Sequence, residues 1–195
     1  MKFRASQRLV LGVGVALLTA VPLVSFDGGA ASPRTVSVGH GTPSRYWTPE
    51  GGVSEQARAV LRRSAVARAA VRIYQPFETG DTTVYDRVLH EDFVDVPLAP
   101  GQGPGREGMK AHVTDDLVSA LPDMKVRIEA LYVDGHTVTV RSVISGTHEG
   151  TFLGVPATHR EVSFRAVDIH QLNARRQIVR TDHLEDLFGA YRQIQ

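Results

Sequence analysis

The ionisable residues best placed to do chemistry lie in two predicted strands near the carboxyl end of the chain. One face of the first strand begins apolar and ends with Asp168 and His170, because residues two apart in a strand share a face. A face that changes from apolar to ionisable suits a pocket with a polar end. Alternatively, Asp168 pairs with a neighbouring arginine at the sheet edge, and the sequence does not separate these two interpretations.

The second strand and the residues just after it supply further ionisable groups, which are Arg180, Asp182, His183, Glu185 and Asp186. In a regular strand Asp182 and His183 fall on opposite faces, so at most one of them enters a pocket. A buried carboxylate near a histidine could act as a general base, because desolvation raises its pKa. Alternatively, Glu185 and Asp186 begin a terminal helix, where acids complement its positive end. For Asp186 this second interpretation is the stronger one.

Composition and motifs argue against several other chemistries. The chain has no cysteine, which excludes disulfides, thiolate nucleophiles and zinc–sulfur sites. Its 195 residues carry a formal net charge of +1, which argues against a dedicated nucleic-acid binder. No dinucleotide, phosphate-loop, zinc-protease or serine-hydrolase motif occurs. We therefore expect no metal site and no nucleic-acid partner.

The amino terminus is typical of an export signal. Three basic residues precede the uncharged, mostly apolar run Leu9–Phe26, and small residues follow up to Ala31. Cleavage near Ala31 predicts a secreted or extracytoplasmic protein; the alternative is an uncleaved membrane anchor over residues 1–31. Either allows transient membrane association through this segment. Residues 32–52 are rich in Pro and Gly and are predicted to be a linker, so the folded domain is expected over 53–195.

Within this domain, helical patterns come before β patterns. Helices are predicted over 54–75, 82–89 and 109–121, and strands over 125–133, 137–147, 161–172 and 178–184. Residues 97–108, with four glycines and three prolines, form a long loop of the kind that often borders a site. Helices followed by a run of antiparallel strands indicate an α+β domain. The absence of strand–helix alternation disfavours a doubly wound nucleotide fold.

The stretch from Gly146 to His170, GTHEGTFLGVPATHREVSFRAVDIH, resembles the SnoaL-like polyketide cyclase, or ester cyclase, family. The family pattern includes GTHxGxxxGxPxTG and a later DIH; His159 replaces the last glycine here. Supporting matches occur at Leu121-Pro122-Asp123, Gly105–Gly108, Ile178, Asp186, Leu187, Gly189 and Gln193. The resemblance implies the cone-shaped fold of the nuclear transport factor 2-like superfamily, with three helices packed on a curved antiparallel sheet around one deep pocket.

The resemblance also implies an activity. Cyclases of this group close a polyketide ring by aldol condensation without a metal or cofactor, and an aspartate removes a proton alpha to a carbonyl. His170 matches the pocket histidine, and Asp168 the polar position two before it, so both are assigned to substrate binding. The turn 173–177 is one residue longer than usual, so Asp182, His183 and Asp186 share the catalytic assignment.

We therefore expect an exported domain that binds a small hydrophobic carbonyl compound and carries out cofactor-free acid/base chemistry. The alternative is a non-catalytic module that binds a small molecule or forms a homodimer through its curved sheet.

Overall fold

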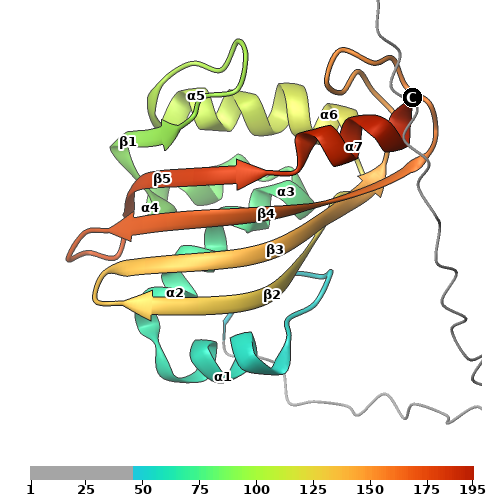
Figure 1. Ribbon diagram of the computed structural model, residues 1–195. Coiled ribbons are helices and arrows are strands. Elements are labelled where there is room, and N and C mark those ends of the chain that lie inside the picture. Colours follow the sequence, from blue (N-terminus) through green and yellow to red (C-terminus); the bar gives the residue numbers. More distant parts are fainter. Residues whose placement is uncertain (1–45) are drawn as a thin grey trace, which may run out of the picture. The chain divides into compact units, whose positions relative to one another are not determined.

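In residues 46–195, which this computed structural model describes, five strands form one curved sheet in the order β1–β5–β4–β3–β2 (Figure 1). The strands are β1 (Leu89–Val96), β2 (Lys125–Asp134), β3 (Thr137–Thr147), β4 (Glu161–Leu172) and β5 (Ile178–Glu185). The four strands predicted after Pro122 are confirmed, each to within one residue. The predicted signal segment 1–31 and linker residues 32–45 lie outside the described residues.

One feature of the sheet differs from the expectation of a wholly antiparallel arrangement. The neighbours from β2 to β5 are antiparallel, but β1 pairs with β5 in parallel, with Val94 opposite Arg180 and Val96 opposite Asp182. The first strand of the domain therefore lies beside the last. This long-range pairing brings β1 and the loop after it to the same end of the sheet as β5.

The helices are short and cover one face and the ends of the sheet (Figure 1). They are α1 (Glu55–Arg63), α2 (Ala65–Ala70), α3 (Gln75–Thr79), α4 (Tyr85–Val88), α5 (Gly105–Ala111), α6 (Val118–Ala120) and α7 (Leu187–Ile194). A 3-10 turn, Val71–Tyr74, joins α2 to α3, and a π-helical turn, His112–Leu117, joins α5 to α6. The α+β fold with a curved sheet is thus confirmed.

The first predicted helix, 54–75, is interrupted at Ser64, which ends α1 and caps the start of α2. Ser64 leaves the helical conformation, and its side chain accepts a hydrogen bond from the Ala67 N–H, which caps α2. The chain also stays helical past Pro76, because proline lies in the first turn of α3, where its missing N–H has no helical partner to lose. Gly80, with a φ of 70°, then ends α3.

The domain begins earlier than the predicted boundary at residue 53. Tyr46 and Trp47 pack against the hydrophobic core, and Val53 forms a bridge with Ile128 of β2. A Cβ atom on Gly51 would lie 2.4 Å from the Val126 carbonyl oxygen, so only glycine fits this close approach. Residues 46–52 therefore belong to the folded domain. No helix in residues 46–195 is long and apolar enough to cross a bilayer.

Strand β4 shows how the sequence pattern creates an interior face. Its burial alternates without a break along all twelve residues, as expected when one face meets the core and the other meets solvent. The buried side chains are Val162, Phe164, Ala166, Asp168, His170 and Leu172. Two polar residues are thereby carried into the interior by the same alternation that buries their apolar neighbours.

Candidate active site

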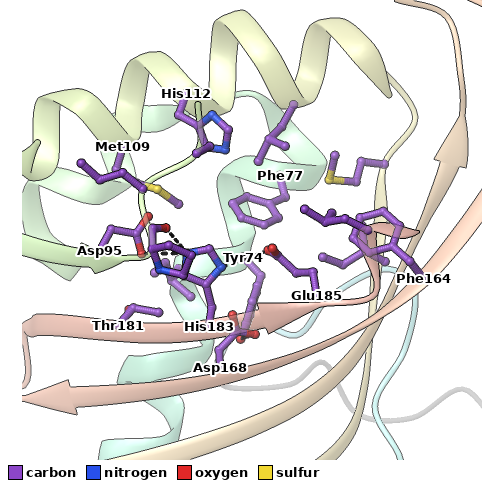
Figure 2. Close-up of a pocket in the computed structure, with 18 of the residues that line it drawn as sticks. Tyr74, Phe77, Asp95, Met109, His112, Phe164, Asp168, Thr181, His183 and Glu185 are labelled. Atoms are coloured by element: carbon purple, nitrogen blue, oxygen red, sulfur yellow. Dashed lines mark hydrogen bonds and ion pairs between the residues drawn. The ribbon is translucent and has the colours of Figure 1, made fainter. Parts of the chain in front are cut away.

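A cavity of about 230 Å³ lies between the inner face of the sheet, the helices and the loop after β1 (Figure 2). Most of its lining is apolar and includes Ile73, Phe77, Met109, Leu117, Met124, Ile144, Phe152 and Phe164. Its polar lining comprises Tyr74, Asp95, His112, Asp168, His170, Thr181, His183 and Glu185. An apolar cavity with a few convergent polar groups is the usual form of a small-molecule site.

The register between β4 and β5 sets the polar side chains next to one another. Asp168 lies directly opposite His183, and His170 lies opposite Thr181. Facing residues in an antiparallel pair have Cβ atoms about 4.5–5.5 Å apart. The two strands therefore present these four side chains to the cavity as two adjacent pairs.

A chain of hydrogen bonds links four buried groups and ends on the Asp168 carboxylate. The Tyr74 hydroxyl donates to Asp168 Oδ2 at 2.7 Å and lies 3.1 Å from His170 Nε2. The other ring nitrogen, His170 Nδ1, lies 2.9 Å from Thr181 Oγ1. Because the tyrosine has one proton and gives it to Asp168, His170 Nε2 must be the donor to the tyrosine oxygen. His170 Nδ1 then accepts from Thr181.

Burial sets the protonation states in this chain. Desolvation raises the pKa of Asp168 to about 7, although the hydrogen bond from Tyr74 opposes the rise. Desolvation lowers the pKa of His170 to about 3, so its ring is neutral at physiological pH. Burial, together with the Asp168 charge, raises the pKa of Tyr74 well above its usual value. Asp168 is therefore the member of the chain that titrates near neutral pH.

His183 is the centre of a second polar cluster. Its Nδ1 lies 3.2 Å from Glu185 Oε1, and its Nε2 donates to the Pro97 carbonyl at 2.8 Å and lies 3.5 Å from Asp95 Oδ1. The hydrogen bond to Glu185 and the charges of Glu185 and Asp95 raise the pKa of His183 to about 9. Burial raises the pKa of Asp95. A protonated His183 therefore faces Asp168 across the strand pair.

The structure brings three of the five residues predicted from the sequence into the cavity, namely Asp168, His170 and His183. It does not bring Asp182 or Asp186 there. Asp182 points to the other face of β5, where Arg180 donates to both of its carboxylate oxygens at 2.6 and 2.8 Å. Asp186 caps α7 by accepting from the Gly189 N–H at 2.8 Å, in agreement with the helix-start interpretation.

Four polar residues of the cavity lining were not identified from the sequence, namely Tyr74, Asp95, His112 and Thr181. Tyr74 lies in the predicted helix 54–75, where no spacing relates it to Asp168 or His170, and Thr181 is an uncharged residue between Arg180 and Asp182. Asp95 could have been found, because it lies two residues after the buried Phe93 of β1 and so shares its face. Its position opposite His183 depends on the parallel pairing of β1 with β5, which no local pattern indicates.

Among the described residues, His90, Glu91 and Asp92 are grouped closely enough to hold a metal ion. They are partly or fully exposed on β1, and none of them lines the cavity. Exposed acidic groups of this kind are common without a metal. This cluster therefore contributes nothing to the chemistry of the candidate site.

Comparison with known proteins connects this site to a family. A search of curated proteins finds no match. TsrD from Streptomyces laurentii is 26% identical, with a TM-score of 0.62, over 68% of this chain and 96% of that one. A proposed polyketide cyclase from Bacillus cereus is 25% identical, with a TM-score of 0.60, over 77% of this chain and 93% of that one.

The family model of the SnoaL-like polyketide cyclases matches residues 67–194. That span includes Tyr74 and the polar residues from β1, β4 and β5 that line the cavity. The chain therefore belongs to the SnoaL-like polyketide cyclase family, within the nuclear transport factor 2-like superfamily.

Proposed function

We propose that this domain binds a small hydrophobic carbonyl compound and removes a proton alpha to its carbonyl, with Asp168 as the base. The observation that carries the proposal is the position of Asp168, buried at the polar end of an apolar cavity with a pKa of about 7. A general base works best when its pKa lies near the working pH. This role differs from the substrate contact that the sequence comparison implied for Asp168.

The hydrogen bonds of Asp168 leave one carboxylate oxygen available. Oδ2 accepts from Tyr74, whereas the described residues give Oδ1 no partner. In the proposed step the C–H bond breaks, its proton goes to Oδ1, and its electron pair becomes an enolate. An aldol ring closure follows when the enolate carbon attacks a second carbonyl of the same molecule, and the alkoxide that forms takes the proton back from Asp168. No cofactor takes part in these steps.

His183 supports this chemistry through its charge. Its ring nitrogens are engaged by Glu185 and by the Pro97 carbonyl, which hold the imidazolium in a fixed place beside the base. A fixed positive charge in a site of low polarity stabilises negative charge that develops on a substrate oxygen. The same charge favours the ionised form of Asp168.

The experiment follows exchange of alpha protons for deuterium by NMR, with a panel of hydrophobic ketones and β-keto esters as probes. We expect exchange to rise with pH through about 7, as Asp168 ionises. Asp168→Asn should slow exchange by about 100-fold or more, the range for loss of a general base. Asp182→Asn, which removes a carboxylate from the outer face of the same sheet, is the matched control and should stay within about twofold of the parent.

The alternative is a non-catalytic binding module. The predominance of apolar groups in the cavity lining favours it. It would be supported if probes raised the melting temperature of the protein without any exchange that depends on Asp168.

Homodimer formation is a separate part of the proposal. It is supported by apolar side chains exposed on the outer face of the sheet, namely Val167, Ile169 and Leu184. Light scattering after gel filtration would test it, and a monomer at all concentrations would contradict it.

Export remains a proposal that rests on residues 1–31. Mass spectrometry of the protein recovered outside the cell would test it by locating the new amino terminus near Ala31.

A further inference from the structure

A second hollow on the domain is built from arginines and aromatic rings. It is lined by Tyr46, Trp47, Ala65, Arg68, Ala69, Arg72, Gln75 and Arg176, and we call it the arginine groove. It shares no residue with the lining of the candidate active site. Among the described residues that line it, none is acidic. The groove is therefore a distinct, positively charged feature.

Two different parts of the chain supply its cations. Arg68 of α2 and Arg72 of the following turn are four residues apart, so they lie on the same side of a helical run. Arg176 comes from the turn between β4 and β5. Arg72 and Arg176 form no ion pair with any described carboxylate, and Arg176 is exposed. Both guanidinium groups are thus available to an external anion.

One side of the groove is formed by Arg68, Tyr46 and Trp47, which are held in place by contacts with the rest of the domain. The Arg68 guanidinium donates to the Leu61 carbonyl at 2.6 Å and lies 5.7 Å from the centre of the Tyr46 ring. Trp47 packs partly against the hydrophobic core and lines the groove beside Tyr46. Tryptophan and tyrosine are the residues enriched at the level of lipid headgroups, because their rings are amphipathic.

The positive charge of this region is local. Residues 46–195 contain 17 Lys and Arg and 20 Asp and Glu, so the domain as a whole has a net charge of −3. In contrast, the lining of the groove contains three arginines and no acidic residue. A basic face on an acidic domain orients the molecule toward an anionic surface.

The groove also lies where the chain enters the domain. Tyr46 is the first described residue, and 19 residues separate it from the uncharged run Leu9–Phe26. A segment of that length spans at most about 65 Å when fully extended. If the apolar run binds a bilayer, the groove is held within this distance of the membrane surface.

We propose that the arginine groove is a docking face for an anionic lipid bilayer, with Arg72 and Arg176 contacting lipid phosphates and Trp47 reaching the headgroup layer. Basic residues near an anionic membrane are attracted to it, and the attraction weakens with salt. The inference is independent of the acid/base chemistry proposed for the cavity. It predicts that the domain itself, and not only its amino-terminal segment, recognises anionic lipid.

The experiment uses the full chain and two kinds of vesicle, one of phosphatidylcholine alone and one that also contains phosphatidylglycerol. Trp47 is the only tryptophan of the chain, so its fluorescence reports on the groove directly. We expect tighter binding to the anionic vesicles at low salt, with quenching of Trp47 by brominated lipid. Arg72→Gln with Arg176→Gln should weaken this binding by about 30-fold, since each basic residue near the surface contributes about 1 kcal/mol.

The control is Arg127→Gln with Arg141→Gln, which removes the same charge from β2 and β3, away from the groove, where both side chains contact Glu129. It should bind like the parent, and thermal unfolding should show that both double variants fold. Equal binding to both vesicles, binding that the groove variants do not change, or binding without quenching of Trp47 would each overturn the proposal. So would a response to inorganic phosphate without any response to vesicles, which would indicate a site for small anions.

Discussion

At Asp168 two physical effects oppose each other. Burial favours the neutral acid, while the hydrogen bond from Tyr74 favours the carboxylate, and the result is a pKa of about 7. A buried aspartate without a donor would stay protonated further into the alkaline range. An exposed one would be ionised at all physiological pH values and would be a weak base. Tyr74 is therefore the larger of two influences that lower the pKa of Asp168, the other being the charge of His183.

Replacing Tyr74 with phenylalanine tests this balance. Since the lost hydrogen bond favours the carboxylate, Tyr74→Phe should raise the pKa of Asp168 by about 1–2 pH units, the equivalent of a hydrogen bond to a charged group. NMR of the Asp168 side-chain carboxyl carbon as a function of pH measures this directly. Any alpha-proton exchange should shift to higher pH by the same amount.

The matched control is Tyr85→Phe. Tyr85 is also buried and donates to the Ile73 carbonyl at 2.9 Å, without a contact to Asp168. Loss of the Tyr85 hydroxyl should lower the free energy of unfolding by about 1–3 kcal/mol, as loss of the Tyr74 hydroxyl should. It should leave the pKa of Asp168 unchanged. An unchanged Asp168 titration in Tyr74→Phe would show that this hydrogen bond does not tune the base.

At the scale of elements, helix α7 depends on a side-chain cap formed by Asp186. The Asp186 carboxylate accepts from the Gly189 N–H and lies so close that a Cβ atom on Gly189 would be 2.3 Å from Asp186 Oδ2. Asp186, which the family resemblance included among the candidate catalytic residues, thus caps a helix. A side chain at position 189 would have to displace the capping carboxylate of Asp186.

We expect Gly189→Ala to destabilise the domain by about 1 kcal/mol, the typical value for loss of a helix cap. In an ordinary helix interior a change from glycine to alanine stabilises the protein by up to about 1 kcal/mol. A destabilised Gly189→Ala protein would therefore show that the Asp186 cap has been disturbed. Urea unfolding measures the change. Asp186→Ala should cause a similar loss, and the double variant should be little worse than either single one. A stabilised Gly189→Ala protein would show that the cap contributes nothing.

Across the whole molecule, His183 connects parts of the chain that are far apart in sequence. It joins β5 to Asp95 of β1 and to Pro97, where the loop that borders the cavity begins. Gln102 extends the connection, because its side-chain amide donates to Asp95 and accepts from the Ala99 N–H. The loop that borders the cavity is therefore held to the sheet by His183 at Pro97 and by Gln102 at Asp95.

This arrangement gives stability a defined pH dependence. The pKa of His183 is raised from 6.5 to about 9 in the folded protein. The stabilisation from its protonated form is complete below about pH 6.5 and is lost as pH rises through about 9. His183→Gln should therefore be less stable than the parent by about 1–2 kcal/mol at pH 6, allowing for partial solvent screening.

Thermal unfolding from pH 6 to pH 10 measures this difference, which should shrink toward zero at the alkaline end. His136→Gln, in the exposed turn between β2 and β3, is the control and should unfold like the parent throughout. A gap between parent and His183→Gln that is constant with pH would mean that packing of the ring, and not its charge, holds the loop.

Much of the fold follows from local patterns. The alternation in β4 predicted that Asp168 and His170 share one face, and the structure shows that this face is buried. The same rule correctly limited the cavity to one of Asp182 and His183. The sequence around Asp186 also predicted that this residue begins the terminal helix. Each of these features depends on residues within a few positions of one another, so periodicity is enough to show them.

The residue pattern was enough to predict the four strands after Pro122, the family and the polar face of β4, but it did not place β1 in the sheet and did not say whether Asp182 or His183 faces inward on β5. Which polar groups act together follows from the tertiary structure. Tyr74 and Asp168 are 94 residues apart, and Asp95 meets His183 only because β1 pairs with β5. The pKa values depend on the same packing, since burial is a property of the assembled domain and not of a segment. The candidate base was therefore visible as a residue in the sequence, but its chemistry was set by distant side chains that folding brings around it.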